Sequence, residues 1–141
     1  MTTDRRRQRE QWAADGFFIV RGMFDAADCV ALVAEAIDVA RNGIRDADPP
    51  LIVVPEGHVR AGATEPEESV AKVFRLHRHP PFHAFAFDTR VLEVVSSIIG
   101  PDVDIFLSQF IFKWAEAYGQ PWHQDSLYFP YQPDRQVGVW V

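Results

Sequence analysis

The sequence contains a single cysteine, Cys29, and no apolar run long enough to cross a lipid bilayer. One cysteine excludes a disulfide framework within the chain, which suits a reducing compartment. The charged N-terminus is not followed by the apolar core of a secretion signal. We therefore expect a cytoplasmic protein that does not span a membrane.

Positive charge is also scarce: the sequence has 14 Lys and Arg residues against 20 Asp and Glu residues, and its net charge is −6. This balance argues against nucleic acid or an anionic membrane as a partner. The local exception is a group of four arginines near the start, which we interpret as a solvated helix face in preference to a docking patch. Those arginines are Arg5, Arg6, Arg7 and Arg9.

Several catalytic signatures are missing as well. The chain has neither a GxGxxG nor a P-loop motif, which removes the usual signals for dinucleotide and nucleoside triphosphate binding. Ser126 lies close to His123, but no nucleophile-elbow glycine pattern surrounds it. What is present is a normal globular composition, with 48% hydrophobic residues and 11 Phe, in a chain of 141 residues that fits one domain.

The first part of the chain predicts helices. Residues 4–14 are expected to form a polar helix, and residues 17–20 a short apolar strand after a turn. Asp25 is the expected N-cap of a second helix, which Gly43 ends. The apolar positions of this helix at helical spacing are Val30, Val33, Ile37 and Ala40.

The middle of the chain is less regular. Residues 44–69 carry four prolines and read as a long flexible loop, with a brief strand at LIVVP. Residues 69–80 form a second short ordered piece, and Pro80 and Pro81 open a helix through Phe87. Asp88 caps a further apolar helix, which Gly100 and Pro101 stop.

Residues 104–114 give the clearest strand pattern, DIFLSQFIFKW. Alternation places Gln109 on a face with aliphatic neighbours and Phe110 and Phe112 on the other. Gln109 is then either a core amide or a pocket-lining residue. Residues 135–141, RQVGVWV, are expected to form a last strand, after a turn at YQPD. Helices followed by strands indicate an α+β fold, or helices outside a barrel-like β core.

The stretch WHQDSLYFPY contains a possible metal site at His123 and Asp125. Residues two apart on a strand point to one side, about 6–7 Å apart, so both side chains can reach one ion. An imidazole with a carboxylate suits Fe(II), with zinc as a competitor. Taken alone, a His-x-Asp pair is more often a surface or turn feature.

The remaining histidines do not obviously complete such a site. His77, His79 and His83 form a cluster before and within the Pro80 region, and His58 lies in the long loop. The cluster could bind a metal, but its position favours ordinary loop or helix-cap residues.

Five motifs in chain order extend the pattern: DGFFIVRGMF, AKVFRL, SQFIFKW, PWHQDSLYFPYQP and VGVWV. With them the sequence resembles the phytanoyl-CoA dioxygenase family of Fe(II)/2-oxoglutarate-dependent oxygenases. The resemblance implies a double-stranded β-helix (a jelly-roll, cupin-like fold) with N-terminal helices. It implies an enzyme that uses dioxygen and 2-oxoglutarate to hydroxylate an unactivated C–H bond of a small organic substrate.

The resemblance also implies roles for individual residues. His123 and Asp125 correspond to the metal ligands, and Asp125 favours hydroxylation because halogenating relatives lack this carboxylate. The positions implied to line the 2-oxoglutarate site are Lys72, Gln109, Gln124 and Trp140. Lys72 could instead be a surface lysine and Trp140 an ordinary buried aromatic. No further residue is assigned a catalytic role.

The family pattern continues past the end of this sequence. In relatives a second histidine completes the iron site and an arginine clamps the far carboxylate of 2-oxoglutarate. Residues 1–141 are therefore expected to be the N-terminal part of one family domain, with an incomplete barrel. The alternatives are an inactive fragment or a binding module that depends on a partner chain, and a zinc-dependent hydrolase.

Overall fold

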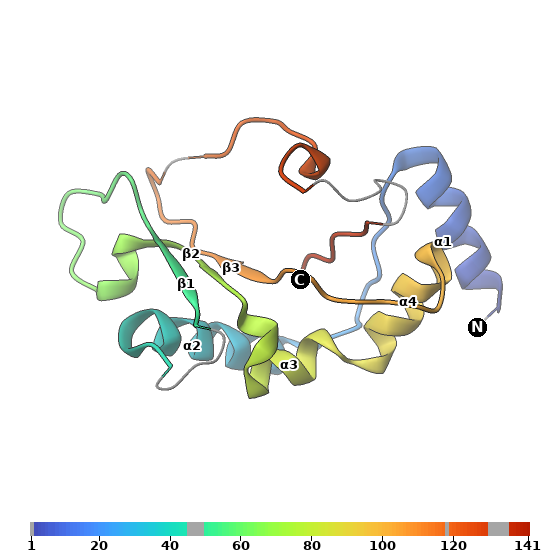
Figure 1. The fold of residues 1–141 in the computed structure, drawn as a ribbon, viewed down its shortest axis with the longest axis horizontal. Coiled ribbons are helices and arrows are strands. Elements are labelled where there is room, and N and C mark those ends of the chain that lie inside the picture. The colour runs from blue at the N-terminus through green and yellow to red at the C-terminus, as the bar shows by residue number, and fades with distance from the viewer. Residues whose placement is uncertain (1, 45–49, 118, 130–135) are drawn as a thin grey trace. The chain divides into compact units, whose positions relative to one another are not determined.

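The computed structural model describes residues 2–44, 50–117, 119–129 and 136–141 (Figure 1). The helices are α1 (Thr2–Asp15), α2 (Ala26–Asn42), α3 (Pro80–Ala86) and α4 (Thr89–Ile99). The strands are β1 (Ile52–Pro55), β2 (Val70–Phe74) and β3 (Gln109–Ile111). The 3₁₀ turns are η1 (Pro66–Ser69), η2 (Leu76–Arg78) and η3 (Asp125–Leu127).

This mixture of helices and a small antiparallel sheet is compatible with the predicted α+β class. The described residues do not form a double-stranded β-helix. The chain divides into two compact units. The first unit comprises Met1–Asp25, Phe87–Asp104 and His123–Val141, and the second comprises Ala26–Ala86 and Ile105–Trp122. No helix in the described part of the chain has both the length and the apolar character needed to cross a membrane.

The sheet of the second unit has the order β1-β2-β3, with both pairs antiparallel (Figure 1). Val73 on the central strand lies opposite Val53 on one side and Phe110 on the other. The register shifts between Val54 and Pro55, where proline has no N–H to give to the ladder. β2 therefore holds the sheet together, since each of the other strands pairs with it alone.

The hydrophobic core of the second unit lies where α2 and α3 pack with the sheet residues. Val73 is fully buried, and Phe112 packs against Phe110 and Trp114 with ring centroids 4.9 and 6.1 Å away. The buried members of this cluster are Ala36, Val39, Val70, Val73, Leu76, Phe82 and Phe112.

The apolar positions named at helical spacing in α2 do not all lie in the core. Val30 and Val33 are 68% and 44% exposed, whereas Ala36 and Val39 are the residues that are buried. Both buried residues lie in the C-terminal half of the helix, while Leu32 in its N-terminal half packs partly buried against the cluster. Gly43 ends the helix as predicted, with φ 69° and its N–H donated to the Val39 carbonyl.

The strand predicted over 104–114 is also wrong in extent, since β3 covers three residues. A strand needs a partner, and only the part of the segment beside β2 has one. Single backbone bonds, Arg75 N to Ser108 O and Phe112 N to Ala71 O, flank the ladder at 2.9 Å. The predicted alternation holds within it, because Phe110 and Phe112 pack in the cluster while Gln109 is exposed.

Two other predicted strands do not form. Residues 17–20 have no ladder partner in the described part of the chain, and Phe17 and Ile19 are exposed. Residues 136–141 are likewise outside any ladder. The turn predicted at residues 131–134 lies outside the described residues.

The first unit contains α1 and α4, which contact each other. Asp88 caps α4 as predicted, accepting the Arg90 N–H at 2.8 Å, and Gly100 follows the helix with φ 102°. Val91 and Val95 are the buried residues of α4. Arg5 of α1 forms an ion pair with Glu93 of α4, which connects the two helices on the outside.

The brief strand predicted at LIVVP is confirmed as β1, and the rest of the segment predicted as a long loop over 44–69 is more ordered than expected. It contains η1, which is held by two buried carboxylates. Glu67 accepts Arg41 Nε and Nη2, both at 2.6 Å, so the turn is attached to α2 by a bidentate pair. Residues 45–49 lie outside the described residues.

Glu68 is the second buried carboxylate of η1, with 5% of its side chain exposed. It accepts the backbone N–H groups of Glu65 and Thr64, at 3.0 and 2.8 Å, and also binds Arg60. These backbone hydrogen bonds, with the help of Arg60, lower the pKa of Glu68 from 4.5 to about 2. The carboxylate is therefore an internal cap for the turn only while it is charged.

We expect the folded state to lose stability as the pH falls from about 5 to about 2. In the unfolded chain Glu68 is protonated near its ordinary pKa of 4.5, whereas in the folded chain its pKa is about 2. The stabilisation is thus complete above the unfolded pKa and disappears at the folded one. Urea midpoints measured from pH 2 to 7 test this expectation.

The matched variants are Glu68→Gln, which is expected to flatten the profile, and Glu116→Gln, an exposed residue of the same unit, which should follow the native profile. A Glu68→Gln profile that still falls as steeply as the native one would contradict this role of Glu68.

Candidate metal centre

The His-x-Asp pair lies at the start of a 3₁₀ turn and not on the predicted strand. Gln124 is extended and precedes η3, and its carbonyl accepts the Leu127 N–H at 2.9 Å. The Asp125 carbonyl accepts the N–H groups of Tyr128 and Phe129 at 2.9 and 3.0 Å. The local backbone is therefore closed into a turn directly after the histidine.

This turn still brings the two side chains together. His123 Nε2 and Asp125 Oδ1 are 3.3 Å apart, with 21% and 60% of their side chains exposed. Two ligand atoms about 2.1 Å from one ion, at about 90° to each other, lie about 3 Å apart. The separation therefore fits neighbouring positions on a single metal ion, although it arises from a turn and not from strand alternation.

The His123 ring is placed by an aromatic neighbour. Tyr128 meets it edge to face, with centroids 5.1 Å apart and an interplanar angle of 77°. The aromatic residue follows η3, so the same turn that presents Asp125 also positions the imidazole. Tyr128, which follows Asp125 in the same motif, thus has a structural role as a packing partner of His123.

A shallow hollow lies beside Asp125 in the first unit. Its lining residues are Gln124, Asp125, Ser126, Gln136 and Gly138. Gln124 thus lies next to Asp125 in the lining of the hollow. Sequence reasoning did not single out Gln136, and a glutamine in a short apolar segment gives little signal by itself.

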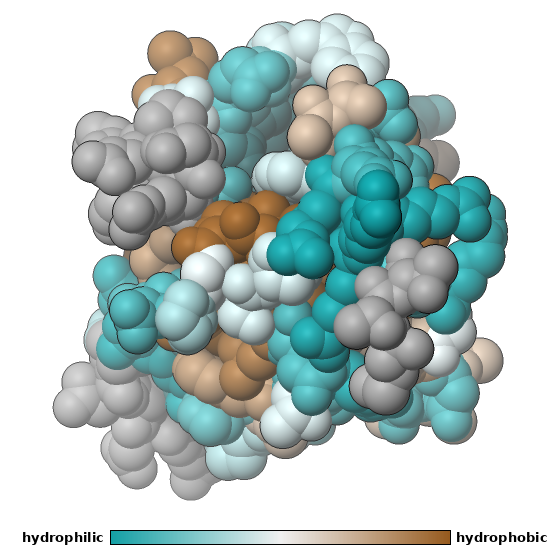
Figure 2. All heavy atoms as spheres, turned by 90° about the vertical axis from the view of Figure 1, so that its right-hand side faces the viewer, coloured by the Kyte–Doolittle hydropathy of each residue, from teal (hydrophilic) through white to brown (hydrophobic). Residues whose placement is uncertain are grey.

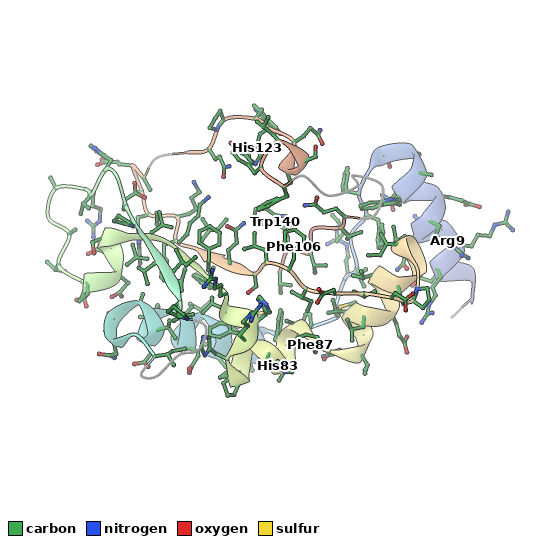
Figure 3. The ribbon with its side chains drawn as sticks, viewed as in Figure 1. Arg9, His83, Phe87, Phe106, His123 and Trp140 are labelled. Carbon is green, nitrogen blue, oxygen red and sulfur yellow. The ribbon has the colours of Figure 1, made fainter. Side chains whose placement is uncertain are left out.

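Trp140 belongs to the same unit and is 82% exposed, so it is not an ordinary buried aromatic. Its indole Nε1 lies 3.7 Å from the point that a Cβ on Gly138 would occupy. Figure 3 labels His123 and Trp140. His123 directly precedes the hollow-lining residues 124–126, and Trp140 lies two residues after the hollow-lining Gly138.

The other two predicted cofactor residues belong to the second unit. Lys72 lies on β2 between Val54 and Ile111, and its Nζ donates to Gln120 Oε1 at 3.2 Å. Gln109 on β3 is exposed, so the prediction of a core amide is wrong.

One member of the histidine cluster, His77, has side-chain and backbone contacts that hold it in the second unit. His77 and His79 are buried, and Ser108 Oγ accepts the His77 backbone N–H at 2.8 Å and lies 2.7 Å from His77 Nδ1. His83 lies on α3. Within the described ranges, no three His, Cys, Asp or Glu side chains are grouped so that they could hold a metal ion.

Comparison with known proteins identifies the family. A family model described as phytanoyl-CoA dioxygenase (PhyH) matches residues 12–141. No curated protein and no solved structure matches the chain. Because the family model covers nearly all of the sequence, the chain belongs to the phytanoyl-CoA dioxygenase family.

Proposed function

We propose that the chain acts as part of an Fe(II)- and 2-oxoglutarate-dependent dioxygenase that hydroxylates an unactivated C–H bond of a small organic substrate. Membership of the family supports an iron-dependent oxygenase in general. The observation that carries the proposal to particular residues is the 3.3 Å separation of His123 Nε2 and Asp125 Oδ1. One imidazole and one carboxylate are two members of the facial triad that binds non-haem Fe(II).

In this proposal residues 1–141 belong to one family domain, and His123 and Asp125 hold the iron. When bound, iron with 2-oxoglutarate and dioxygen supplies the oxidising power for C–H hydroxylation. The His123 imidazole binds through Nε2 in its neutral form, so its proton stays on Nδ1. The Asp125 carboxylate contributes negative charge and occupies a position that a halide would otherwise need. Tyr128 restricts rotation of the imidazole.

The assignment of the co-substrate residues rests on the resemblance of their sequence motifs to those of the family. Gln124 lines the hollow next to Asp125, and Trp140 offers an exposed indole in the same unit. Lys72 supplies a cation for a carboxylate, and its present partner, the neutral amide of Gln120, is readily exchanged. Gln109 offers an exposed amide on β3. Their assignment to 2-oxoglutarate is part of the proposal.

The direct test is an anaerobic titration with Fe(II) followed by 2-oxoglutarate. Chelation of iron by the 2-oxo acid gives a weak visible charge-transfer band, which a zinc hydrolase would not show. The band should depend on His123 and Asp125. A spectrum that is unchanged by 2-oxoglutarate, in protein shown to bind Fe(II) at these residues, would count against the proposed co-substrate.

We expect the 141-residue chain by itself to form no succinate from 2-oxoglutarate above the level of Asp125→Ala. The reason is that the described residues place two ligands together and no third. Succinate measured by NMR under air, with Fe(II) and ascorbate, tests this expectation. Turnover that the Asp125→Ala substitution abolishes would show that the two ligands suffice.

A partner-dependent binding module is the second candidate, and the apolar surface of the chain favours it. A hollow in the second unit is lined by Val33 and Ile37 of α2 and by residues 110–114. Exposed apolar side chains also break the polar surface in Figure 2. Buried apolar area is the main source of association energy. A folded monomer, shown by analytical ultracentrifugation at high concentration, would argue against self-association as the way this surface is covered.

A further inference from the structure

The hollow beside Asp125 has a polar lining. Two amides, Gln124 and Gln136, the hydroxyl of Ser126 and the carboxylate of Asp125 surround it, and Gly138 adds no side chain. None of the described lining residues contributes an aliphatic or aromatic side chain. Sites for acyl chains are lined mainly by apolar groups, so this hollow is suited to a different kind of ligand.

Gln136 is the unusual member of this lining. Its Oε1 is shielded from solvent and has no hydrogen-bond partner among the described residues. A buried carbonyl oxygen without a donor is unfavourable, because the hydrogen bonds that it made to water have not been replaced. Gln124, in contrast, is exposed, so its amide is open to solvent.

The amide of Gln136 can also reach a ligand. Its terminal torsion has a broad energy minimum, so the group can turn towards the hollow that the residue lines. A ligand with an N–H or O–H group would then supply the missing hydrogen bond. An apolar ligand would leave Oε1 unpaired and would also cover the polar groups around it.

We propose that Gln136 is a substrate-recognition residue that accepts a hydrogen bond from an N–H or O–H group of a small polar substrate. The inference rests on the proposed function, since Asp125 lines the same hollow and a group bound by Gln136 is thereby held next to a metal ligand. The position of that donor group in the substrate would decide which carbon faces the metal. A fatty acyl chain is not the ligand of this hollow.

A matched pair of probes isolates the donor group. N-methylacetamide has one N–H, and N,N-dimethylacetamide replaces it with a methyl group. Each is titrated into the ¹⁵N-labelled 141-residue chain, and the shifts of the Gln136 side-chain amide and the Gly138 backbone amide are followed. We expect N-methylacetamide to bind about threefold to tenfold more tightly, as one neutral hydrogen bond allows.

Three variants check the assignment. Gln136→Leu should remove the preference for N-methylacetamide, whereas Gln136→Glu, which keeps an acceptor, should retain it. Asn42→Leu removes an exposed amide of the second unit and should leave the preference unchanged. The dispersion of each variant's amide spectrum shows that it is folded. Equal binding of the two probes to the native chain, or a preference that survives Gln136→Leu, would overturn the proposal.

Paramagnetic broadening by Mn²⁺ separates this proposal from the proposed function. Mn²⁺ should broaden the NMR signals of His123 and Asp125 to the same extent in the Gln136→Leu variant as in the native chain. If Mn²⁺ binds there but the probes bind equally, the substrate inference alone is wrong. If Mn²⁺ does not bind there, the metal assignment is wrong and the inference, which depends on it, is overturned as well.

Discussion

Replacing His123 with alanine is expected to weaken Mn²⁺ or Fe(II) binding by about 100-fold. Loss of a residue that only orients a ligand already costs about 10–100-fold in metal affinity, and His123 is proposed as a ligand itself. The substitution leaves Asp125 as the remaining member of the 3.3 Å pair. The free Mn²⁺ signal in electron paramagnetic resonance gives the affinity, and titration under anaerobic conditions does so for Fe(II).

The matched control removes a carboxylate elsewhere in the first unit. Asp102→Asn lies at an exposed position and should bind Mn²⁺ as the native chain does. Asp125→Asn is expected to lie between the two, because an amide oxygen can still bind a hard cation but carries no charge. If His123→Ala bound Mn²⁺ with the native affinity, the ion would be held somewhere other than at this pair.

Replacing Phe112 with alanine is expected to destabilise the fold by about 3–5 kcal/mol. Phe112 is buried in the core cluster of the second unit and contacts the rings of Phe110 and Trp114. Removing the ring loses the free energy of burial and leaves a cavity that the flanking rings cannot fully close. Urea unfolding followed by tryptophan fluorescence measures the change.

Phe17→Ala is the control for this substitution, since Phe17 is exposed in the first unit. Its replacement should change the free energy of unfolding by less than about 0.5 kcal/mol, as surface substitutions usually do. An equal effect of the two substitutions would mean that Phe112 is not a core residue. If the two units unfold separately, the same urea curves will show two transitions in place of a single cooperative one.

Helix ends could be predicted from the sequence because their signals are local. Asp88, Gly43 and Gly100 each act through backbone groups within one turn, and all three end or begin a helix where predicted. The buried face of α2 could not be predicted so well. Which turns of an amphipathic helix are covered depends on where the rest of the core meets it, so Val30 is exposed while Val39 is buried.

Strands were predicted less well for a related reason. An apolar alternating segment is a strand only where another strand provides backbone partners, and residues 17–20 and 136–141 find none among the residues that the structure describes. The buried carboxylates of η1 were also missed. Glu67 and Glu68 look like surface acids in the sequence, and their burial is explained by Arg41 and Arg60 and by the backbone N–H groups that Glu68 accepts.

The candidate metal ligands could be named in advance because they are neighbours in the sequence. His123 and Asp125 meet through a single turn, so their contact needs no long-range prediction. The strand geometry invoked for them was wrong, yet the side chains converge. Gln136 could not be found in this way, because its importance lies in an unpaired oxygen that depends on its surroundings.

The sheet order β1-β2-β3 also constrains the order of folding events. β1 and β2 are joined by residues 56–69, which η1 and its carboxylates already fold back, whereas β3 arrives from residues 75–108 further along. Closing the shorter connection loses less chain entropy, so the β1–β2 hairpin is favoured as the first pairing. β3 then pairs with the free edge of β2. Because this contact joins residues far apart in the sequence, we expect the pairing of β3, which brings Phe112 into the core, to be the slow step of folding.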